Sequence, residues 1–453
     1  MSRSGRLVPA LAAALILAAC APGTEPSPTR PSGSPVETVT PGPSASAPSG
    51  FVEPAPGSSS AIYPPNPGAI VVAIDPGHGG CLDWGVPDPS ERGVELSEKQ
   101  LTLEIGLRLR ELLVADGIGA VMTREDDEAL AGDHHPELGC TGPAWRDVNG
   151  DGEAGFDPAG NTRTRDELQA RLDLANLAAA DALVSIHINS PFDGGQSIEI
   201  AFSETFYTDE TPWGATLTER LAREVEAGVV ARLGEVADYE RGDRGVTAHN
   251  FYIVAPPLLA ETDERPNRWA QPTRGGLMPV VLAEVGSITL RAEHDLLASA
   301  TGRDAVASGI FDGLAAFFGA RELAGRIGLD GVPVGAAPEV EEGDGPPYWA
   351  SSVPEGPLRL RLTNTGTAAW PVERALVAGW QASEEPYLAM APSSLQPLEV
   401  DVPALAPGES TVVAVELPEP PAERALAWIS LSVGDQTLAD LGSPALQLAS
   451  GAP

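Results

Sequence analysis

The chain has 453 residues, of which 64 are acidic and 28 are basic, so its formal net charge at pH 7 is −36. We expect no nucleic-acid partner, because phosphate binding requires clustered Lys and Arg side chains. The length allows two or three domains with sizeable cores. Lys99 is the only lysine, and all the other basic residues are arginines.

The first twenty residues predict export. Arg3 and Arg6 precede an apolar run, Leu7–Cys20, which is too short and wrongly flanked for a membrane-spanning helix and is typical of a signal peptide. The run ends in LAAC, which resembles a bacterial lipobox and implies lipidation of Cys20. We expect residues 1–20 to be a lipoprotein signal peptide, and the protein to be extracytoplasmic, anchored to the cell membrane by lipid and facing the cell wall. The alternative is an ordinary signal peptide whose cysteine is incidental.

Residues 21–66 are rich in Pro, Ser, Thr and Gly and contain almost no large apolar side chains. Such a segment cannot bury enough surface to offset the entropy of ordering it. We therefore expect a disordered tether, extended and partly polyproline in character, between the membrane and the folded part of the chain.

From residue 67 to residue 325 the pattern alternates between strand and helix, which predicts a three-layer α/β/α domain. Apolar runs predict strands over 69–75, 118–123, 182–188, 197–202 and 280–286. Apolar residues at helical spacing predict helices over 97–113, 165–181, 212–233 and 302–320. The first of these helices opens with Ser-x-x-Gln, which predicts a capping box between Ser97 and Gln100.

The rest of the chain has a different pattern. Residues 326–346 are rich in Gly, Pro and Glu and predict a linker. Short alternating runs separated by turn residues then predict an all-β sandwich over 347–453. Within it, Thr363–Pro371 (TNTGTAAWP) resembles a strand–turn–Trp signature of immunoglobulin-like domains. We expect its tryptophans in the core, and both a wall-binding and a spacer role are open for this domain.

Several ionisable residues stand where predicted strands end. His78 follows the first strand, and His187 and Glu284 lie near the ends of two others. Glu98 lies in a first helical turn, where the helix dipole favours an ionised carboxylate by about 0.3–1 kcal/mol. Since ligands bind beyond the carboxyl ends of strands in open α/β sheets, we expect these side chains at one edge of the sheet. Two histidines and a carboxylate suit a catalytic zinc, with the fourth position left to water.

Taken alone, each of these residues has a structural alternative, but the surrounding motifs add a resemblance. Four segments, in order, are similar to the four blocks of the zinc-dependent N-acetylmuramoyl-L-alanine amidase family, amidase_3 type. They are IDPGHGG, LSEKQLTLEIGLRLRELL, RLDLANLAAADALVSIHINS and MPVVLAEVGSITLRAEHDLL. The resemblance covers nearly all of residues 69–320 and departs from the family at Ser287, where an aromatic residue is common.

The resemblance implies a role for each residue. His78, Glu98 and His187 match the zinc ligands, with Glu95 as a competitor for Glu98, and Glu284 matches the catalytic glutamate. The implied reaction is hydrolysis of the amide between N-acetylmuramic acid and the L-alanine of the stem peptide, with peptidoglycan as the partner. Two alternatives stay open: a non-catalytic lipoprotein that binds peptidoglycan or regulates other proteins, and a zinc peptidase that cuts within the stem.

Two cysteines remain after the lipobox. Because disulfides form and persist outside the cytoplasm, Cys81 and Cys140 are expected to form a disulfide. Closing a loop of this length would stabilise the fold by about 4 kcal/mol on the chain-entropy model. Two buried thiols are the alternative. The bridge would hold a loop beside His78.

Two insertions interrupt the resemblance, at about 125–164 and 256–275. We hypothesise that one of them covers the zinc site. The first contains DVNGDGEAGFDP, in which Asp147, Asn149 and Asp151 alternate before a glycine, as at the start of a calcium loop. The twelfth position is proline rather than glutamate. Calcium (Ca²⁺) binding and a polar loop with Asx turns are therefore both open.

Overall fold

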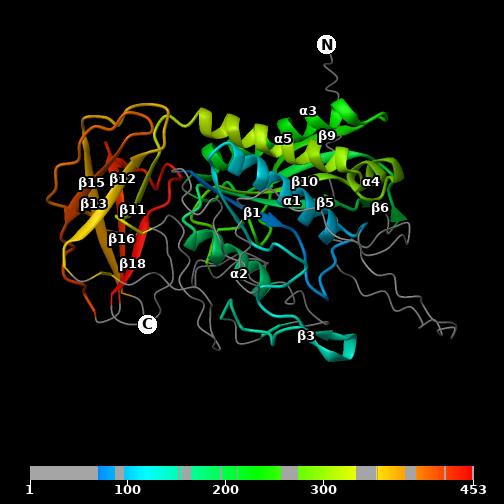
Figure 1. Ribbon diagram of the computed structural model, residues 1–453, viewed down its shortest axis with the longest axis horizontal. Coiled ribbons are helices and arrows are strands. Elements are labelled where there is room, and N and C mark those ends of the chain that lie inside the picture. Colours follow the sequence, from blue (N-terminus) through cyan, green and yellow to red (C-terminus); the bar gives the residue numbers. More distant parts are fainter. Residues whose placement is uncertain are drawn as a thin grey trace, which may run out of the picture.

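The computed structural model describes most of the chain between residues 70 and 450 (Figure 1). The described ranges are 70–86, 96–150, 154–155, 165–193, 196–211, 213–256, 274–332, 353–354, 356–382, 394–422 and 425–450. The expected signal peptide, the expected lipidation site Cys20 and the expected tether lie outside them. Within the described ranges, no helix is both long and apolar enough to cross a membrane.

A six-stranded sheet forms the centre of the first domain, in the order β2-β1-β5-β10-β8-β9. The strands are β1 (Val71–Pro76), β2 (Gly119–Met122), β5 (Ala182–Asn189), β8 (Phe202–Tyr207), β9 (Gly242–Ala248) and β10 (Val280–Ser287). Strands β2, β1, β5 and β10 are parallel, whereas β8 is antiparallel to β10. The carboxyl ends of β1, β5 and β10 therefore meet at one edge.

Helices cover both faces of this sheet, which confirms the predicted three-layer architecture (Figure 1). They are α1 (Glu98–Ala115), α2 (Arg165–Leu177), α3 (Glu219–Val236), α4 (Arg291–Ala298) and α5 (Ala300–Gly319). Successive strand residues face opposite sides of a sheet. Accordingly, Val72 and Ile74 of β1 pack in one apolar cluster with α1, α3 and α5, while Val71 and Ala73 pack in another with α2.

One predicted strand is displaced along the chain. A strand was expected over 197–202, but the sheet strand here is β8, Phe202–Tyr207. Side chains of β8 are buried on both faces of the sheet, whereas Ile198 and Ile200 stay partly exposed. The displacement brings Glu204 into the sheet, opposite Glu284 of β10.

The predicted capping box at the start of α1 is wrong. The Gln100 amide donates to Glu104 at 3.3 Å, one turn further on, and the Ser97 side chain makes no capping hydrogen bond. The first backbone N–H groups of the helix instead donate to the carbonyls of Val86 and Trp84, at 3.0 and 3.3 Å. The helix start is therefore stabilised by the loop that follows β1.

The C-terminal region forms two antiparallel sheets, which confirms the expected all-β region (Figure 1). One sheet contains β11 (Gly325–Leu329), β12 (Leu358–Asn364) and β15 (Ser410–Val415). The other contains β13 (Arg374–Ala382), β14 (Gln396–Pro397), β16 (Ala425–Val433), β17 (Gln436–Thr437) and β18 (Leu446–Ser450). Leu360 of the first sheet and Ile429 of the second belong to one apolar core, together with Trp370, so the two sheets pack face to face.

The first residues of the linker predicted over 326–346 belong to a strand, because Gly325–Leu329 pair with β12 as strand β11, and residues 333–346 lie outside the described ranges. This strand also contacts the first domain. Arg326 donates to Asp181 at 2.5 Å, and the same carboxylate oxygen accepts from the N–H of Val71 at 2.9 Å. Since Asp181 immediately precedes β5, the sandwich contacts the edge of the sheet opposite to the carboxyl ends of β1 and β5.

Cys81 and Cys140 form the predicted disulfide, with a Cα–Cα distance of 5.7 Å. The bridge joins the loop after β1 to the segment between β2 and α2. That segment contains the short strands β3 (His134–His135) and β4 (Cys140–Thr141). Two parts of the chain that are distant in sequence are thus covalently linked next to His78.

Candidate active site

His78 occupies a strained turn directly after β1. Its φ of 63° lies in the left-handed region, which is uncommon for a residue with a side chain. The N–H groups of Gly77 and Gly79 donate to the carbonyls of Ile186 and Asp83, both at 2.9 Å, and hold the turn. His78 Nδ1 lies 2.8 Å from Asp83 Oδ1. An N–H at Nδ1 donates to this carboxylate, so Nε2 is the nitrogen that would bind a metal once its own proton is lost.

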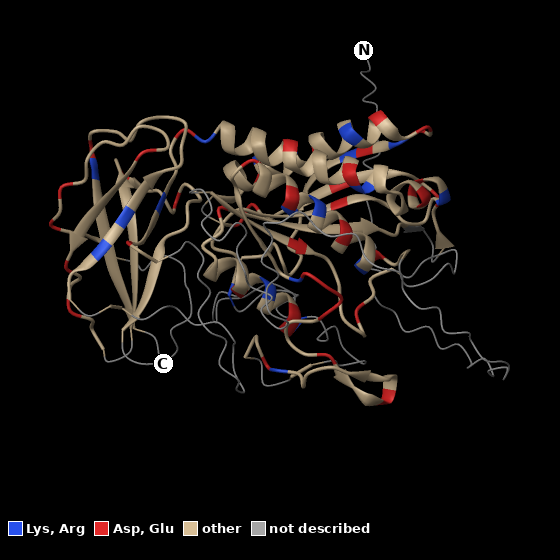
Figure 2. Cartoon of the chain, viewed as in Figure 1, with Lys and Arg blue, Asp and Glu red and all other residues tan. Residues whose placement is uncertain are grey.

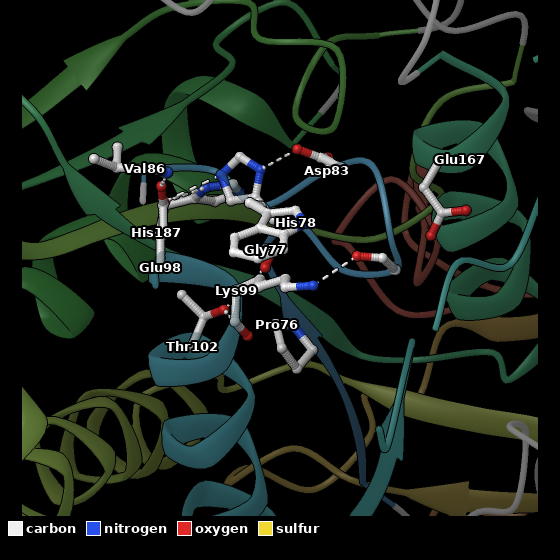
Figure 3. A network of polar contacts seen from close by, with 12 residues as sticks. Pro76, Gly77, His78, Asp83, Val86, Glu98, Lys99, Thr102, Glu167 and His187 are labelled. Atoms are coloured by element: carbon white, nitrogen blue, oxygen red, sulfur yellow. Dashed lines mark hydrogen bonds and ion pairs between the residues drawn. The ribbon is translucent and has the colours of Figure 1, made fainter. Parts of the chain in front are cut away.

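Three of the predicted residues come together at the carboxyl edge of the sheet (Figure 3). One ligand atom from each of His78, Glu98 and His187 lies within 4.8 Å of the others. Glu98 Oε1 is 3.2 Å from His78 Nε2 and 3.1 Å from His187 Nδ1. Two imidazole nitrogens and one carboxylate oxygen form a donor set that a catalytic zinc accepts.

Backbone groups orient the Glu98 carboxylate. The N–H of Val86 donates to Oε2 at 2.9 Å and the N–H of Ile188 donates to Oε1 at 3.0 Å. Burial raises the pKa of Glu98, but the charge of His78 and hydrogen bonds from His187 and His78 outweigh it and hold that pKa well below its usual range. The carboxylate is therefore ionised at neutral pH, as a metal ligand must be.

Two glycines make room for the cluster. A Cβ on Gly77 would lie 2.4 Å from His187 Cε1, so any side chain there would displace the imidazole. Gly85 has a φ of +65°, and a Cβ on it would lie 2.4 Å from Glu98 Oε2 and 2.6 Å from His78 Cδ2. Both positions require the absence of a side chain, and Gly85 also requires a backbone conformation that glycine adopts readily.

Glu284 of β10 lies beside these residues. It is the register partner of His187 on β5 and of Glu204 on β8. Burial and the nearby charge of Glu98 raise the pKa of Glu284 well above its usual value. Its Oε2 atom is buried and has no hydrogen-bond partner among the described residues. A buried, unpaired carboxyl oxygen is unfavourable for stability, and its presence beside a His/Glu/His cluster is typical of a general acid–base group.

Sequence reasoning missed the buried cations that hold the turn at His78. Arg124, Arg171 and Lys99 are each at most 2% exposed. Arg124 and Arg171 both donate to the carbonyl of Pro76, at 2.9 and 2.8 Å, and Arg171 also donates to that of His78 at 2.7 Å. Figure 2 shows that basic residues are sparse among acidic ones. A single lysine in such a chain is the signal that could have drawn attention to one of the three.

The structure describes only some of the other residues that the sequence suggested for a site. Asp147 Oδ1 accepts from the N–H of Gly150 at 2.8 Å, which is the Asx turn of the polar-loop alternative. Asp151 of the candidate calcium loop lies outside the described residues. The same holds for Glu95, the competitor of Glu98, and for residues 257–273 of the second insertion.

The fold and the site together place a buried glutamate beside a His/Glu/His cluster on an α/β sheet, an arrangement that suits a metal-dependent hydrolase. A family model described as N-acetylmuramoyl-L-alanine amidase (Amidase_3) matches residues 72–316. The chain belongs to this family, since the match covers more than half of it.

Individual relatives are distant in sequence. The germination-specific N-acetylmuramoyl-L-alanine amidase of Bacillus subtilis is 26% identical over 252 residues, which are 55% of this chain and 79% of that protein. The N-acetylmuramoyl-L-alanine amidase Rv3717 of Mycobacterium tuberculosis is 25% identical over 275 residues, 57% and 91% of the two chains. The crystal structure of an N-acetylmuramoyl-L-alanine amidase from Clostridium difficile 630 has a TM-score of 0.37 at 25% identity, covering 56% of this chain and 98% of that one.

Proposed function

We propose that the chain is a zinc-dependent amidase that hydrolyses the bond between N-acetylmuramic acid and the L-alanine of the peptidoglycan stem. The observation that carries the proposal is the approach of His78, Glu98 and His187 to within 4.8 Å of one another beside Glu284. Membership of the amidase family over residues 72–316 supports the choice of bond.

The donor atoms fit a zinc ion, because two imidazole nitrogens and a carboxylate leave a position open for reactants. Zinc held there would lower the pKa of a water toward neutrality and polarise the amide carbonyl. Asp83 orients the His78 ring through Nδ1, and the N–H groups of Val86 and Ile188 orient Glu98. Glu284, in its ionised form, would accept the proton of the attacking water and later donate it to the leaving amine of L-alanine.

Metal analysis of the purified chain, followed by digestion of peptidoglycan and mass spectrometry, tests this proposal. We expect bound zinc, and released stem peptides that begin with L-alanine. Products cut within the stem would identify a zinc peptidase instead. A zinc-loaded protein that releases no stem peptide would support the binding or regulatory alternative.

We further propose that the protein is a lipoprotein held to the membrane through Cys20, and that residues 21–66 carry the catalytic domain out to the wall. The disulfide between Cys81 and Cys140 supports an extracytoplasmic location, because such bonds are rare in the cytoplasm. Mass spectrometry of the mature N-terminus tests the anchor. An unmodified N-terminus, or one beyond Cys20, would exclude it.

The immunoglobulin-like sandwich is proposed to act as a spacer. Its contact through Arg326 and Asp181 lies at the opposite edge of the sheet from His78, so it supplies no group to the site through that contact. A truncated chain without the sandwich that no longer sediments with isolated wall would identify a wall-binding module instead.

Calcium at Asp147, Asn149 and Asp151 is retained as a separate proposal, supported by the spacing of these residues. A melting temperature that rises on addition of calcium, and not of magnesium, is the expected result. No response to calcium would leave the Asx-turn loop as the explanation.

A further inference from the structure

The His78 loop (residues 77–86) carries the first proposed ligand, and a supporting segment (residues 125–149), which belongs to the first insertion, packs against it. Lys99 joins the two. Its Nζ donates to the carbonyl of Gly80 and to Asp127 Oδ2, both at 2.7 Å. Figure 3 shows the Lys99 side chain directed away from the His/Glu/His cluster, toward a carboxylate.

The surroundings of Lys99 are unusual for a lysine. Its side chain is 3% exposed, whereas that of Asp127 is 45% exposed. The ammonium also lies 4.6 Å from the centroid of the Trp84 ring, which is a cation–π contact. Lysine is almost never fully buried unless it is paired, because desolvation disfavours its charge. Every one of these contacts is to the His78 loop or to the supporting segment.

Two further links join the same two parts of the chain. The first is the disulfide between Cys81 and Cys140, and the second is a hydrogen bond of 2.6 Å from the N–H of Cys81 to Asp133. The supporting segment is itself held to α2, because the N–H of Ala131 donates to Glu167 at 2.8 Å. The His78 loop therefore cannot move away from α1 without breaking contacts to a segment that is anchored elsewhere.

We propose that Lys99 is a positioning residue: together with the supporting segment it holds His78 at its place relative to Glu98, and thereby sets the affinity of the site for zinc. Helix α1 supplies one proposed ligand, Glu98. Its next residue, Lys99, holds the loop that carries another proposed ligand, His78. The inference rests on the zinc site of the proposed function, and adds to it a role for an insertion of this chain.

Zinc affinity of the full-length chain, measured by competition with a chromogenic chelator, tests the inference. Lys99→Met keeps the volume and removes the charge, and should weaken zinc binding about 10- to 100-fold, as loss of a supporting contact typically does. Lys99→Arg keeps the cation and should lose less. Arg232→Met is the matched control. Arg232 of α3 pairs with Asp312 of α5, so its replacement should leave zinc binding unchanged.

A second variant covers the case in which Lys99→Met does not fold. Asp127→Asn changes an exposed partner and should weaken zinc binding about two- to fivefold, as expected for a partly exposed ion pair. Where both variants fold, Lys99→Met combined with Asp127→Asn should bind zinc no more weakly than Lys99→Met alone, because both changes remove the same link.

A readout that does not use zinc is available because Lys99 is the only lysine. Acetylation of its amine, followed at the peptide level by mass spectrometry, should be at least about tenfold slower in the native chain than in urea, since labelling requires local opening. Equal rates would overturn the inference. Zinc affinities of Lys99→Met and Asp127→Asn equal to wild type would also overturn it, but would leave the zinc site intact. A wild-type chain that binds no zinc would overturn both proposals.

Discussion

His187 and Glu284 are register partners on the adjacent parallel strands β5 and β10. Their side chains therefore lie on the same face of the sheet, one strand spacing of about 4.8 Å apart at the backbone. Backbone hydrogen bonds of the sheet determine this separation, so it does not depend on any loop. His78 differs, because it follows its strand in a turn. Side chains of α1 and α2 hold that turn, together with Arg124, which lies two residues after β2.

Glu284→Gln should separate chemistry from metal binding. The variant keeps the shape of the side chain and removes its acid–base function, so amide hydrolysis should fall by about 10²–10⁴-fold. Zinc content should stay at the wild-type level, because none of the three ligands changes. Initial rates of stem-peptide release and metal analysis on the same sample measure both, and an unchanged rate would contradict the assigned role.

Asp83→Ala should weaken zinc binding by about 10- to 100-fold, because Asp83 accepts the hydrogen bond that orients the His78 ring. Asp83→Asn is the matched control, since its amide oxygen can still accept from Nδ1, and it should retain more of the affinity. Chelator competition on both variants makes the comparison. Equal losses in the two would indicate that the negative charge matters rather than the orientation.

Gly77→Ala should remove zinc binding and activity together, because the new methyl group would lie 2.4 Å from the His187 ring. Gly234→Ala is the control, since a Cβ there meets no atom within 4 Å and the position lies within α3. That change should stabilise the chain by about 0.5–1 kcal/mol through helix propensity. Zinc titration and thermal unfolding of both variants provide the test, and normal zinc binding by Gly77→Ala would refute the close approach.

Glu226 should make stability depend on pH. Its side chain is buried, and burial, assisted by Asp243, raises the pKa to about 8 against the hydrogen bond from Thr205. The folded chain keeps a proton that the unfolded chain loses above the ordinary value of 4.5. The free energy of unfolding should thus fall as the pH rises from about 4.5 to about 8, by up to about 1.4 kcal/mol for each pH unit.

Glu226→Gln should remove this dependence, because the amide stays neutral at every pH. The variant should be more stable than the wild type at about pH 8 and differ little from it at about pH 5. Urea unfolding at the two pH values measures the difference. Parallel pH profiles for the two proteins would show that Glu226 does not hold the proton.

Arg326→Met should destabilise the chain without affecting the zinc site. It removes the ion-pair partner of the buried Asp181, and breaking a buried ion pair lowers stability by about 3–5 kcal/mol. Arg359→Met is the control, because its pair with Asp330 involves an exposed arginine and is expected to contribute at most about 1 kcal/mol. Thermal unfolding compares the two, and equal melting temperatures would contradict the buried pair.

Local patterns were sufficient for much of the fold. The strands that contain His187 and Glu284 were predicted because each is a continuous apolar run with a polar residue near its end. Strand β8 was misplaced, because the amphipathic residues 197–202 have a strand-like composition and only burial against β10 and β9 selects Phe202–Tyr207. The start of α1 was found, but its capping was not, since the capping groups come from a loop rather than from Ser97.

The amino-acid sequence by itself determined the class of the catalytic domain, the pair of cysteines and the identity of the candidate ligands, because these depend on residue type and on periods of a few residues. The tertiary structure alone decided that His78, Glu98 and His187 meet, and which buried cations hold them. Those contacts join segments up to about a hundred residues apart, for example Arg171 with the carbonyl of His78. A local sequence pattern does not reveal which group will pair with a buried charge. A charge needs such a partner only after folding has removed its water.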